Sequence, residues 1–191
     1  MSIGVVGDPY SPGSDYGGNG VKGWPYIVAT RVDGIDVVVH NAAVKGAGYV
    51  HGNSRGVKFA DEISDLTGGE RVIVVAGSVN DRGAPPAELR SAALTVLRAM
   101  LQQAPNAAVV VIGPIWVGPP PGQRVLSLRD EVESAANELG LEFVDPIAER
   151  WFVDRPDLIG ADGKHPTDEG HVYLADRIAP LIQRHFQSER P

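Results

Sequence analysis

Five short apolar runs, rich in Val and Ile, recur along the chain, and each is closed by Gly, Asp or Pro. They lie at residues 3–6, 35–39, 72–75, 108–112 and 141–144. Most of them do not alternate with polar residues, which is typical of strands that are covered on both faces, as in a parallel sheet. The pattern therefore predicts five buried strands.

The segments between the later runs carry apolar residues three and four positions apart. This spacing predicts amphipathic helices over residues 85–103 and 124–139, each covering one side of a sheet. A last helix is expected to begin after Thr167 as N-cap, with a kink at Pro180. Residues 23–32 and 56–66 are shorter, weaker helix candidates.

Strands and helices that alternate in this way predict a three-layer α/β/α sandwich with a mainly parallel five-stranded sheet and right-handed crossovers. The length of 191 residues suits a single domain spanning 1–191. A composition of 43% hydrophobic and 21% charged residues is that of an ordinary globular protein.

Charge and cysteine content exclude several function classes. The net charge of −7 disfavours a nucleic-acid or anionic-membrane partner held by electrostatic attraction. The absence of cysteine excludes disulfides, thiolate chemistry and Cys-ligated zinc. No run approaches the ~20 apolar residues of a membrane span, and no signal-peptide pattern opens the chain. We therefore expect a cytoplasmic protein or a component of an extracellular or phage assembly.

Three polar stretches follow predicted strands or precede the last helix. They are Gly7-Asp8-Pro9-Tyr10-Ser11, Gly77-Ser78-Val79-Asn80-Asp81 and Asp162-Gly163-Lys164-His165-Pro166. Ligands of open parallel sheets bind at the carboxyl ends of the strands, and these stretches fall at that edge. The pattern predicts a site there.

In these motifs, and over essentially its whole length, the chain resembles the SGNH, or GDSL-like, hydrolase family. That family has a Gly-Asp-Ser turn after the first strand, a Gly after the second, Gly-x-Asn-Asp after the third and Asp-x-x-His before the last helix. The corresponding residues here are Gly7-Asp8-Pro9, Gly46, residues 77–81 and the Asp162/His165 pair. The resemblance implies a flavodoxin-like SGNH hydrolase fold.

The resemblance also assigns roles. It implies that His165 is the base, that Asp162 orients it, and that the Gly46 N–H and the Asn80 side chain donate to the oxyanion of an acyl-transfer reaction. No cofactor is implied. His40, His51, His171 and His185 show no metal-ligand spacing, so no metal is expected.

The nucleophile position departs from the family pattern, because Pro9 stands where the serine is expected. Proline has neither a hydroxyl nor a backbone N–H, so both the nucleophile and an oxyanion donor are lost. Loss of a serine nucleophile typically lowers turnover by about 10⁶, and loss of one oxyanion donor lowers it by roughly 10²–10³. We therefore expect impaired catalysis.

Two functions remain open. The first is a catalytically impaired binding or structural module for a small-molecule or carbohydrate ester, with protein partners in a larger assembly. The alternative is an active esterase or acetyl esterase that uses Ser11, or less plausibly Ser14, or a water activated by His165.

Plainer interpretations of the same residues also stand. Asn80 and Asp81 are residue types that commonly stabilise turns, and Gly46, like Gly48, suits a backbone that needs positive φ. We expect Asp8 to be structural.

Overall fold

A five-stranded, fully parallel sheet lies at the centre of the computed structural model, which describes residues 1–8 and 10–187. Its spatial order is β2-β1-β3-β4-β5, and every neighbouring pair is parallel. The strands are β1 (Ser2–Gly7), β2 (Val38–Asn41), β3 (Val72–Ala76), β4 (Ala108–Ile112) and β5 (Glu142–Val144). The predicted parallel sheet is confirmed.

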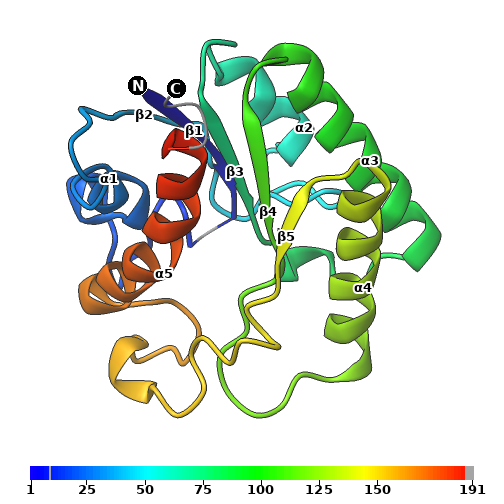
Figure 1. The fold of residues 1–191 in the computed structure, drawn as a ribbon. Helices are drawn as coiled ribbons and strands as arrows, with labels where there is room; N and C mark the ends of the chain where they lie inside the picture. Colours follow the sequence, from blue (N-terminus) through cyan, green and yellow to red (C-terminus); the bar gives the residue numbers. More distant parts are fainter. Residues whose placement is uncertain (9, 188–191) are drawn as a thin grey trace.

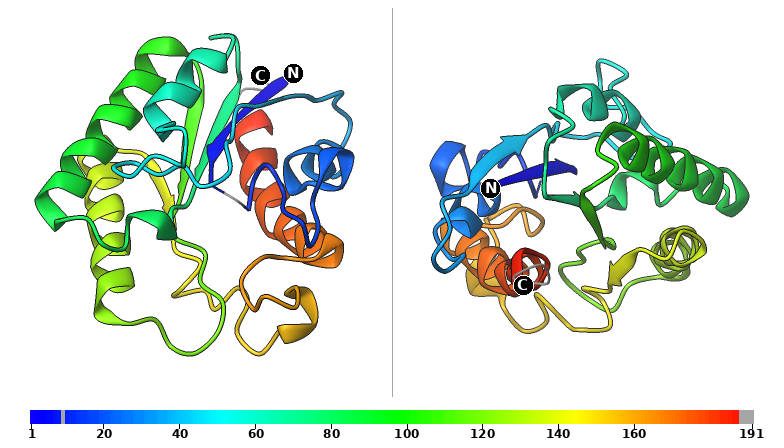
Figure 2. Two further views of the ribbon diagram at one scale, coloured as in Figure 1. Left: turned by 180° about the vertical axis from the view of Figure 1, so that it is seen from behind. Right: turned by 45° about the horizontal axis from the view of Figure 1, so that its top comes forward.

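Helices cover both faces of the sheet. The α-helices are α1 (Trp24–Ala29), α2 (Phe59–Glu62), α3 (Pro86–Gln103), α4 (Gln123–Glu138) and α5 (Asp168–Gln187). Short 3₁₀ turns are η1 (Gly20–Lys22), η2 (Ile63–Asp65), η3 (Val79–Asp81) and η4 (Pro156–Leu158). Figure 1 and Figure 2 show α1 and α5 on one face and α2, α3 and α4 on the other, which gives three layers.

Successive residues of the central strands enter two different hydrophobic cores. In β3, Val72 and Val74 pack in the core beneath α1 and α5, whereas Ile73 and Val75 pack in the core beneath α3 and α4. Side chains of a strand point alternately to the two faces, and here both faces are covered. This double burial explains why the strands contain no polar alternation.

The second strand lies later than predicted. The apolar pattern indicated residues 35–39, but β2 runs from Val38 to Asn41 and pairs with β1 through Ser2↔Val38 to Val5↔Asn41. Ile35 and Val37 still pack against the core, as part of the segment that leads into the strand. An apolar pattern shows which residues are buried, but it does not show which of them form hydrogen bonds with the neighbouring strand. At this edge of the sheet the buried segment begins before the strand does.

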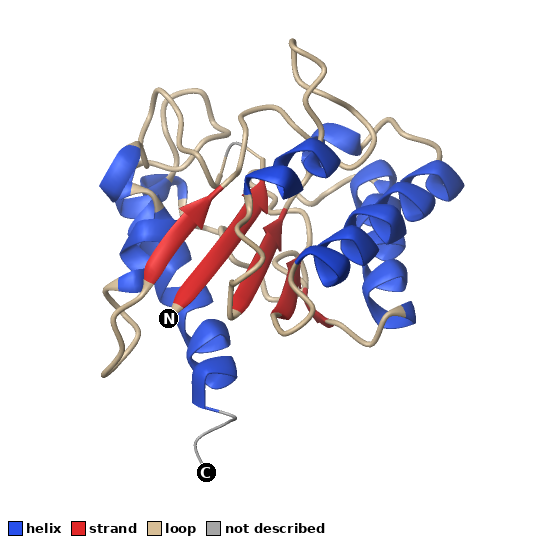
Figure 3. Cartoon of the chain, turned by 90° about the horizontal axis from the view of Figure 1, so that it is seen from above, coloured by secondary structure: helices blue, strands red, loops and turns tan. Residues whose placement is uncertain are grey.

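All five carboxyl ends lie along one edge of the sheet, and Figure 3 shows the loops gathered beyond the arrowheads. Because β1 lies between β2 and β3, the loop after β1 is flanked by the loops after both neighbours. The motifs singled out above follow β1, β2 and β3 and precede α5, so the topology brings them together.

The last helix begins as predicted. The Thr167 hydroxyl accepts a hydrogen bond from the N–H of Gly170, the third residue of α5, at 3.2 Å, which confirms Thr167 as N-cap. Pro180 lies inside α5, which continues to Gln187. No helix among the described residues has both the length and the apolar character needed to cross a bilayer.

Replacement of the N-cap tests this start. We expect Thr167→Ala to lower the free energy of unfolding by about 1 kcal/mol, because the Gly170 N–H loses its acceptor. Thr95→Ala is the control, since that hydroxyl bonds a carbonyl within α3 and caps nothing. Urea unfolding of the three proteins measures the difference, and equal losses in both variants would contradict a capping role.

Candidate active site

The turn before α5 holds His165 and Asp162 against each other. Asp162 Oδ1 accepts the backbone N–H of Lys164 at 3.0 Å and of His165 at 3.1 Å, which fixes the turn. Asp162 Oδ2 lies 2.5 Å from His165 Nδ1. A carboxylate at that distance holds the proton on Nδ1, which leaves Nε2 as the nitrogen able to accept one.

The electrostatics of this pair favour an ionised carboxylate. Partial burial alone would raise the pKa of Asp162, but the hydrogen bonds from the His165 ring, the His165 N–H and the Lys164 N–H outweigh it and hold the pKa at about 2. Asp162 is therefore an anion at neutral pH, which is the state that stabilises a protonated imidazole.

Two tyrosines from the loop after β1 flank the imidazole. Tyr16 lies nearly parallel to it, with ring centroids 6.3 Å apart and an interplanar angle of 4°. Tyr10 is tilted by 42° at the same separation, and its hydroxyl donates to the Lys164 carbonyl at 2.7 Å. The N-terminal loop thus positions the turn that carries His165.

The Asn80 side chain connects the loops after β2 and β3. Its Nδ2 donates to the Ala47 carbonyl at 2.8 Å, and its backbone N–H donates to the Ser78 hydroxyl at 3.0 Å. Gly46, next to Ala47, has a φ of 81°, a conformation that favours glycine. Gly46 thus satisfies the plainer interpretation, and its role as an oxyanion donor stays a prediction.

His165 and Asn80 line the same cavity, of about 420 Å³, which we call the His165 cavity. Its other lining residues are Tyr10, Val79, Arg82, Ile115, Trp116, Val117, Gly163 and Lys164. One wall comes from η3, one from the loop after β4, and one from the turn before α5. The cavity therefore contains a candidate base and a candidate amide donor.

Neither candidate serine, Ser11 or Ser14, lines this cavity. Pro9, at the position where the family has its serine, lies outside the described residues. Ser11 is only 1% exposed, and its hydroxyl has no hydrogen-bond partner among the described residues. Its Oγ packs against β1 so closely that a Cβ on Gly7 would come within 2.6 Å of it. Ser14 is also buried, and its hydroxyl accepts the N–H of Tyr16.

The Asp81 side chain holds the loop after β2 in place. Asp81, fully buried, accepts the N–H groups of Tyr49, Val50 and His51 at 2.7–3.0 Å. A Cβ on Gly48 would lie 2.5 Å from this carboxylate, so that position has no room for a side chain. The turn-stabilising interpretation therefore applies to Asp81, which acts on the loop after β2.

Glu62 was not anticipated. Its two oxygens accept the N–H of Gly7 at 2.9 Å and of Val44 at 3.1 Å, which ties the end of β1 to the loop after β2. Burial raises the pKa of Glu62 to about 8, against the lowering effect of these two bonds. The signal in the sequence was an acidic residue beside Phe59 and Ile63 on the apolar face of a helical pattern.

Asp8 is buried at the end of β1. Its Oδ1 accepts the Tyr10 N–H at 3.3 Å, and its Oδ2 has no hydrogen-bond partner among the described residues. Burial raises the pKa of Asp8 to about 7, against the lowering effect of the bonds from the Tyr10 and Val79 backbone, and the Asp81 charge adds to the rise. The expectation that Asp8 is structural agrees with this environment.

The chain is similar in sequence to proteins of one known family. The model of the GDSL-like lipase/acylhydrolase family matches residues 5–173. A curated GDSL lipase of Mycobacterium tuberculosis is 40% identical over 188 residues, covering 94% of this chain and 80% of that protein.

Two solved structures show the same fold. The lipase/acylhydrolase from Enterococcus faecalis superposes with a TM-score of 0.75 at 17% identity, covering 100% of this chain and 99% of that one. A family two carbohydrate esterase from Clostridium thermocellum, in complex with cellohexaose, gives a TM-score of 0.74 at 15% identity, covering 97% of this chain and 64% of that one.

The raised pKa of Asp8 predicts a pH-dependent stability. Between about pH 4 and pH 7 the unfolded chain ionises this carboxyl while the folded protein keeps it protonated, so stability falls as pH rises through that window. Asp8→Asn should remove the share of the decline that Asp8 causes, on the order of 3 kcal/mol, while the decline caused by the raised pKa of Glu62 remains. Urea unfolding at pH 4.5 and pH 8 measures it.

The exposed Asp154→Asn variant is the control. It should keep the pH dependence of the unmodified protein. An Asp8→Asn variant with the same dependence would show that Asp8 ionises normally in the fold.

Proposed function

The chain belongs to the GDSL-like lipase/acylhydrolase family, and from this premise we propose that it binds an ester ligand in the His165 cavity but hydrolyses it poorly. The observation that carries the proposal is the contact between His165 and Asp162. It is combined with the sequence resemblance, which aligns Pro9 with the family's serine. The base and its orienting carboxylate are present, but the group they would activate is missing.

Chemistry at position 9 supports the impairment. Proline can neither attack a carbonyl carbon nor donate an N–H to the oxyanion, so the covalent route through an acyl-serine is closed. Ser11 would have to leave a buried position at the end of β1 before its hydroxyl reached the His165 cavity. Simple replacement of one serine by the other is therefore disfavoured.

The lining of the cavity supports an ester as ligand. The amide of Asn80 supplies a donor for a carbonyl oxygen, while Ile115, Trp116 and Val117 supply apolar and aromatic surface. The cellohexaose complex of the Clostridium thermocellum esterase makes carbohydrate esters one class worth testing. A binding module of this kind also suits a larger assembly, such as a cell-surface complex or a phage particle, with an acylated partner.

A second candidate is hydrolysis by activated water. It is favoured by the 2.5 Å contact between Asp162 and His165 Nδ1, which leaves Nε2 free to take a proton from a water molecule. In that route the water oxygen attacks the carbonyl carbon while its proton passes to Nε2, and the Asn80 amide stabilises the oxyanion. The intermediate then collapses, the bond to the ester oxygen breaks, and the leaving alcohol takes the proton back from Nε2. The family serine is then not needed.

The two candidates differ in the activity of the unmodified protein. If the site is impaired, hydrolysis of a short-chain activated ester should equal that of His165→Ala, which lacks the base. Initial rates with 4-nitrophenyl acetate measure this. Turnover that disappears in His165→Ala would instead establish the water route or Ser11, and Ser11→Ala then separates those two, since only the Ser11 route needs the hydroxyl.

Restoration of the nucleophile tests the impairment directly. We expect Pro9→Ser to raise ester hydrolysis by at least about 10³-fold, because the missing hydroxyl and N–H both return. The matched control is the double variant Pro9→Ser/His165→Ala, which should stay inactive. A folded Pro9→Ser protein that hydrolyses none of a broad ester panel would refute the assignment of His165, Asp162 and Asn80 to an acyl-transfer site.

A further inference from the structure

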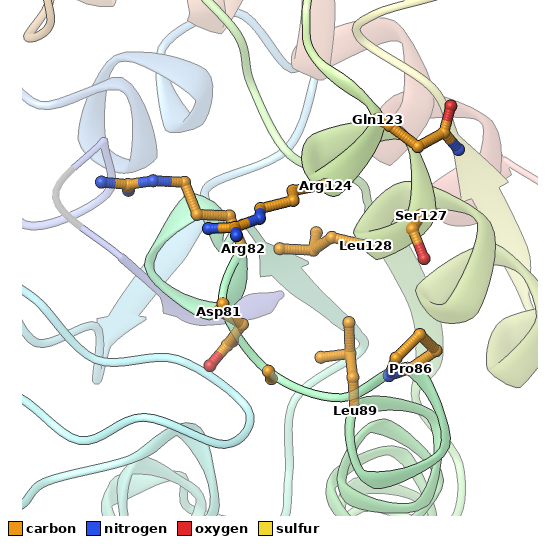
Figure 4. Close-up of a pocket in the computed structure, with 10 residues that line it drawn as sticks. Asp81, Arg82, Pro86, Leu89, Gln123, Arg124, Ser127 and Leu128 are labelled. Carbon is orange, nitrogen blue, oxygen red and sulfur yellow. The ribbon is translucent and has the colours of Figure 1, made fainter.

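A second cavity, of about 360 Å³, lies between η3 and the first turns of α3 and α4. We call it the Arg124 cavity. Figure 4 shows its lining, with Leu89 and Leu128 at its apolar base and with Arg82, Gln123, Arg124 and Ser127 as polar groups. Arg82 lines the His165 cavity as well, so the two cavities share a wall.

Two guanidinium groups in this lining are not neutralised by the protein. Among the described residues, neither Arg82 nor Arg124 forms an ion pair with a carboxylate. Arg82 donates one hydrogen bond, to the Val79 carbonyl at 3.2 Å. Figure 4 shows its guanidinium directed away from Leu89 and Leu128, whereas Arg124 is directed from the start of α4 toward η3. Each arginine carries five N–H donors, so most of them are available to a ligand.

Among the described residues that line the Arg124 cavity, Asp81 is the one carboxylate, and its oxygens face the loop after β2. Its oxygens already accept three backbone N–H groups of the loop after β2, and the residue is fully buried. The first turn of α4 contains no acidic residue and its N-cap, Gly122, has no side chain, so the positive end of the helix adds to the arginine charges. The described lining therefore contains no second carboxylate to offset the positive charge of Arg124 and of the helix end.

The short turn η3 contributes residues to the Arg124 cavity and to the His165 cavity, which contains the candidate base. Val79 and Asn80 face the His165 cavity, Asp81 lines the Arg124 cavity, and Arg82 belongs to both. A ligand that extends from Asn80 past Arg82 would reach Arg124. Lys164, also without an ion pair among the described residues, adds a third cation at the His165 cavity.

We propose that the Arg124 cavity binds an oxyanion group, a carboxylate or a phosphate, carried by the same ligand whose ester lies at His165 and Asn80. This inference rests on the proposed ester-binding function and narrows its ligand to anionic esters. Planar guanidinium groups bind such oxyanions with paired hydrogen bonds. The net charge of −7 repels anions at long range, so the local arginines have to supply the selectivity.

Two small esters that differ in one charge test the proposal. Monomethyl succinate carries a carboxylate, and dimethyl succinate is its neutral counterpart. Each is titrated at low salt into the ¹⁵N-labelled protein, and amide shifts of Gly163 and Ser127 report the His165 and Arg124 cavities respectively. We expect the monomethyl ester to bind at least roughly fivefold more tightly and to shift both signals.

Arg124→Gln is the deciding variant, because Arg124 lines the Arg124 cavity and not the His165 cavity. It should reduce affinity for the monomethyl ester roughly three- to tenfold, toward that of the dimethyl ester. Arg31→Gln makes the same change of net charge beside α1, on the opposite face of the sheet, and should keep the preference. Arg124→Lys should retain part of it.

Other outcomes separate this inference from the function on which it rests. Equal binding of the two esters would overturn the anion site and leave ester binding intact. If neither ester binds, inorganic phosphate is the next probe. Phosphate that shifts Ser127 in the unmodified protein but not in Arg124→Gln would support the anion site while the ester proposal fails. No shift with any of the three probes would overturn both.

Discussion

Carboxyl groups that accept backbone N–H groups hold the loops at the carboxyl ends of the strands in shape. Glu62 joins the end of β1 to the loop after β2, Asp81 holds the next turn of that loop, and Asp162 fixes the turn before α5. A buried N–H without an acceptor costs about 1–3 kcal/mol, so these acids decide which loop conformations are accessible. The relative positions of His165 and Asn80 depend on them.

Several acidic side chains of this region are buried, whereas nearby basic side chains lie at the surface. Asp8, Asp81 and Glu62 lie beneath the loops, whereas Arg82 and Lys164 lie at the surface of the His165 cavity. Burial raises the pKa of Asp8 to about 7 and that of Glu62 to about 8, so much of the acidic charge below the cavity is suppressed near neutral pH. A protein with a net charge of −7 can thus carry cationic side chains in the lining of a cavity.

Much of the fold could be predicted from the sequence, because the central strands are buried on both faces and their apolar runs are uninterrupted. The prediction was wrong at β2, where Ile35 and Val37 are apolar because they pack against the core and not because they belong to the ladder. Local patterns report burial, whereas strand limits depend on the partner strand.

The site could be predicted in part. His165 and Asp162 are three residues apart in one turn, so their contact follows from local geometry. Glu62 and Arg124 were not singled out because their positions depend on packing between distant segments. Glu62 is buried under β1, and Arg124 lines a cavity between α3 and α4. The burial of Ser11 could not be read from a loop rich in Gly and Ser.

The contacts between the two ends of the chain determine when the cavity can form. Tyr10 bonds the Lys164 carbonyl, and the Gly18 N–H bonds Asp168, so β1 and its loop need partners about 150 residues later. During translation β1 leaves the ribosome before α5 has been made. Until α5 emerges, Trp24 and the rest of the core beneath α1 lack their cover. Until α5 has been made, the nascent chain therefore exposes an apolar sheet face, which is the kind of surface that makes folding intermediates prone to aggregate.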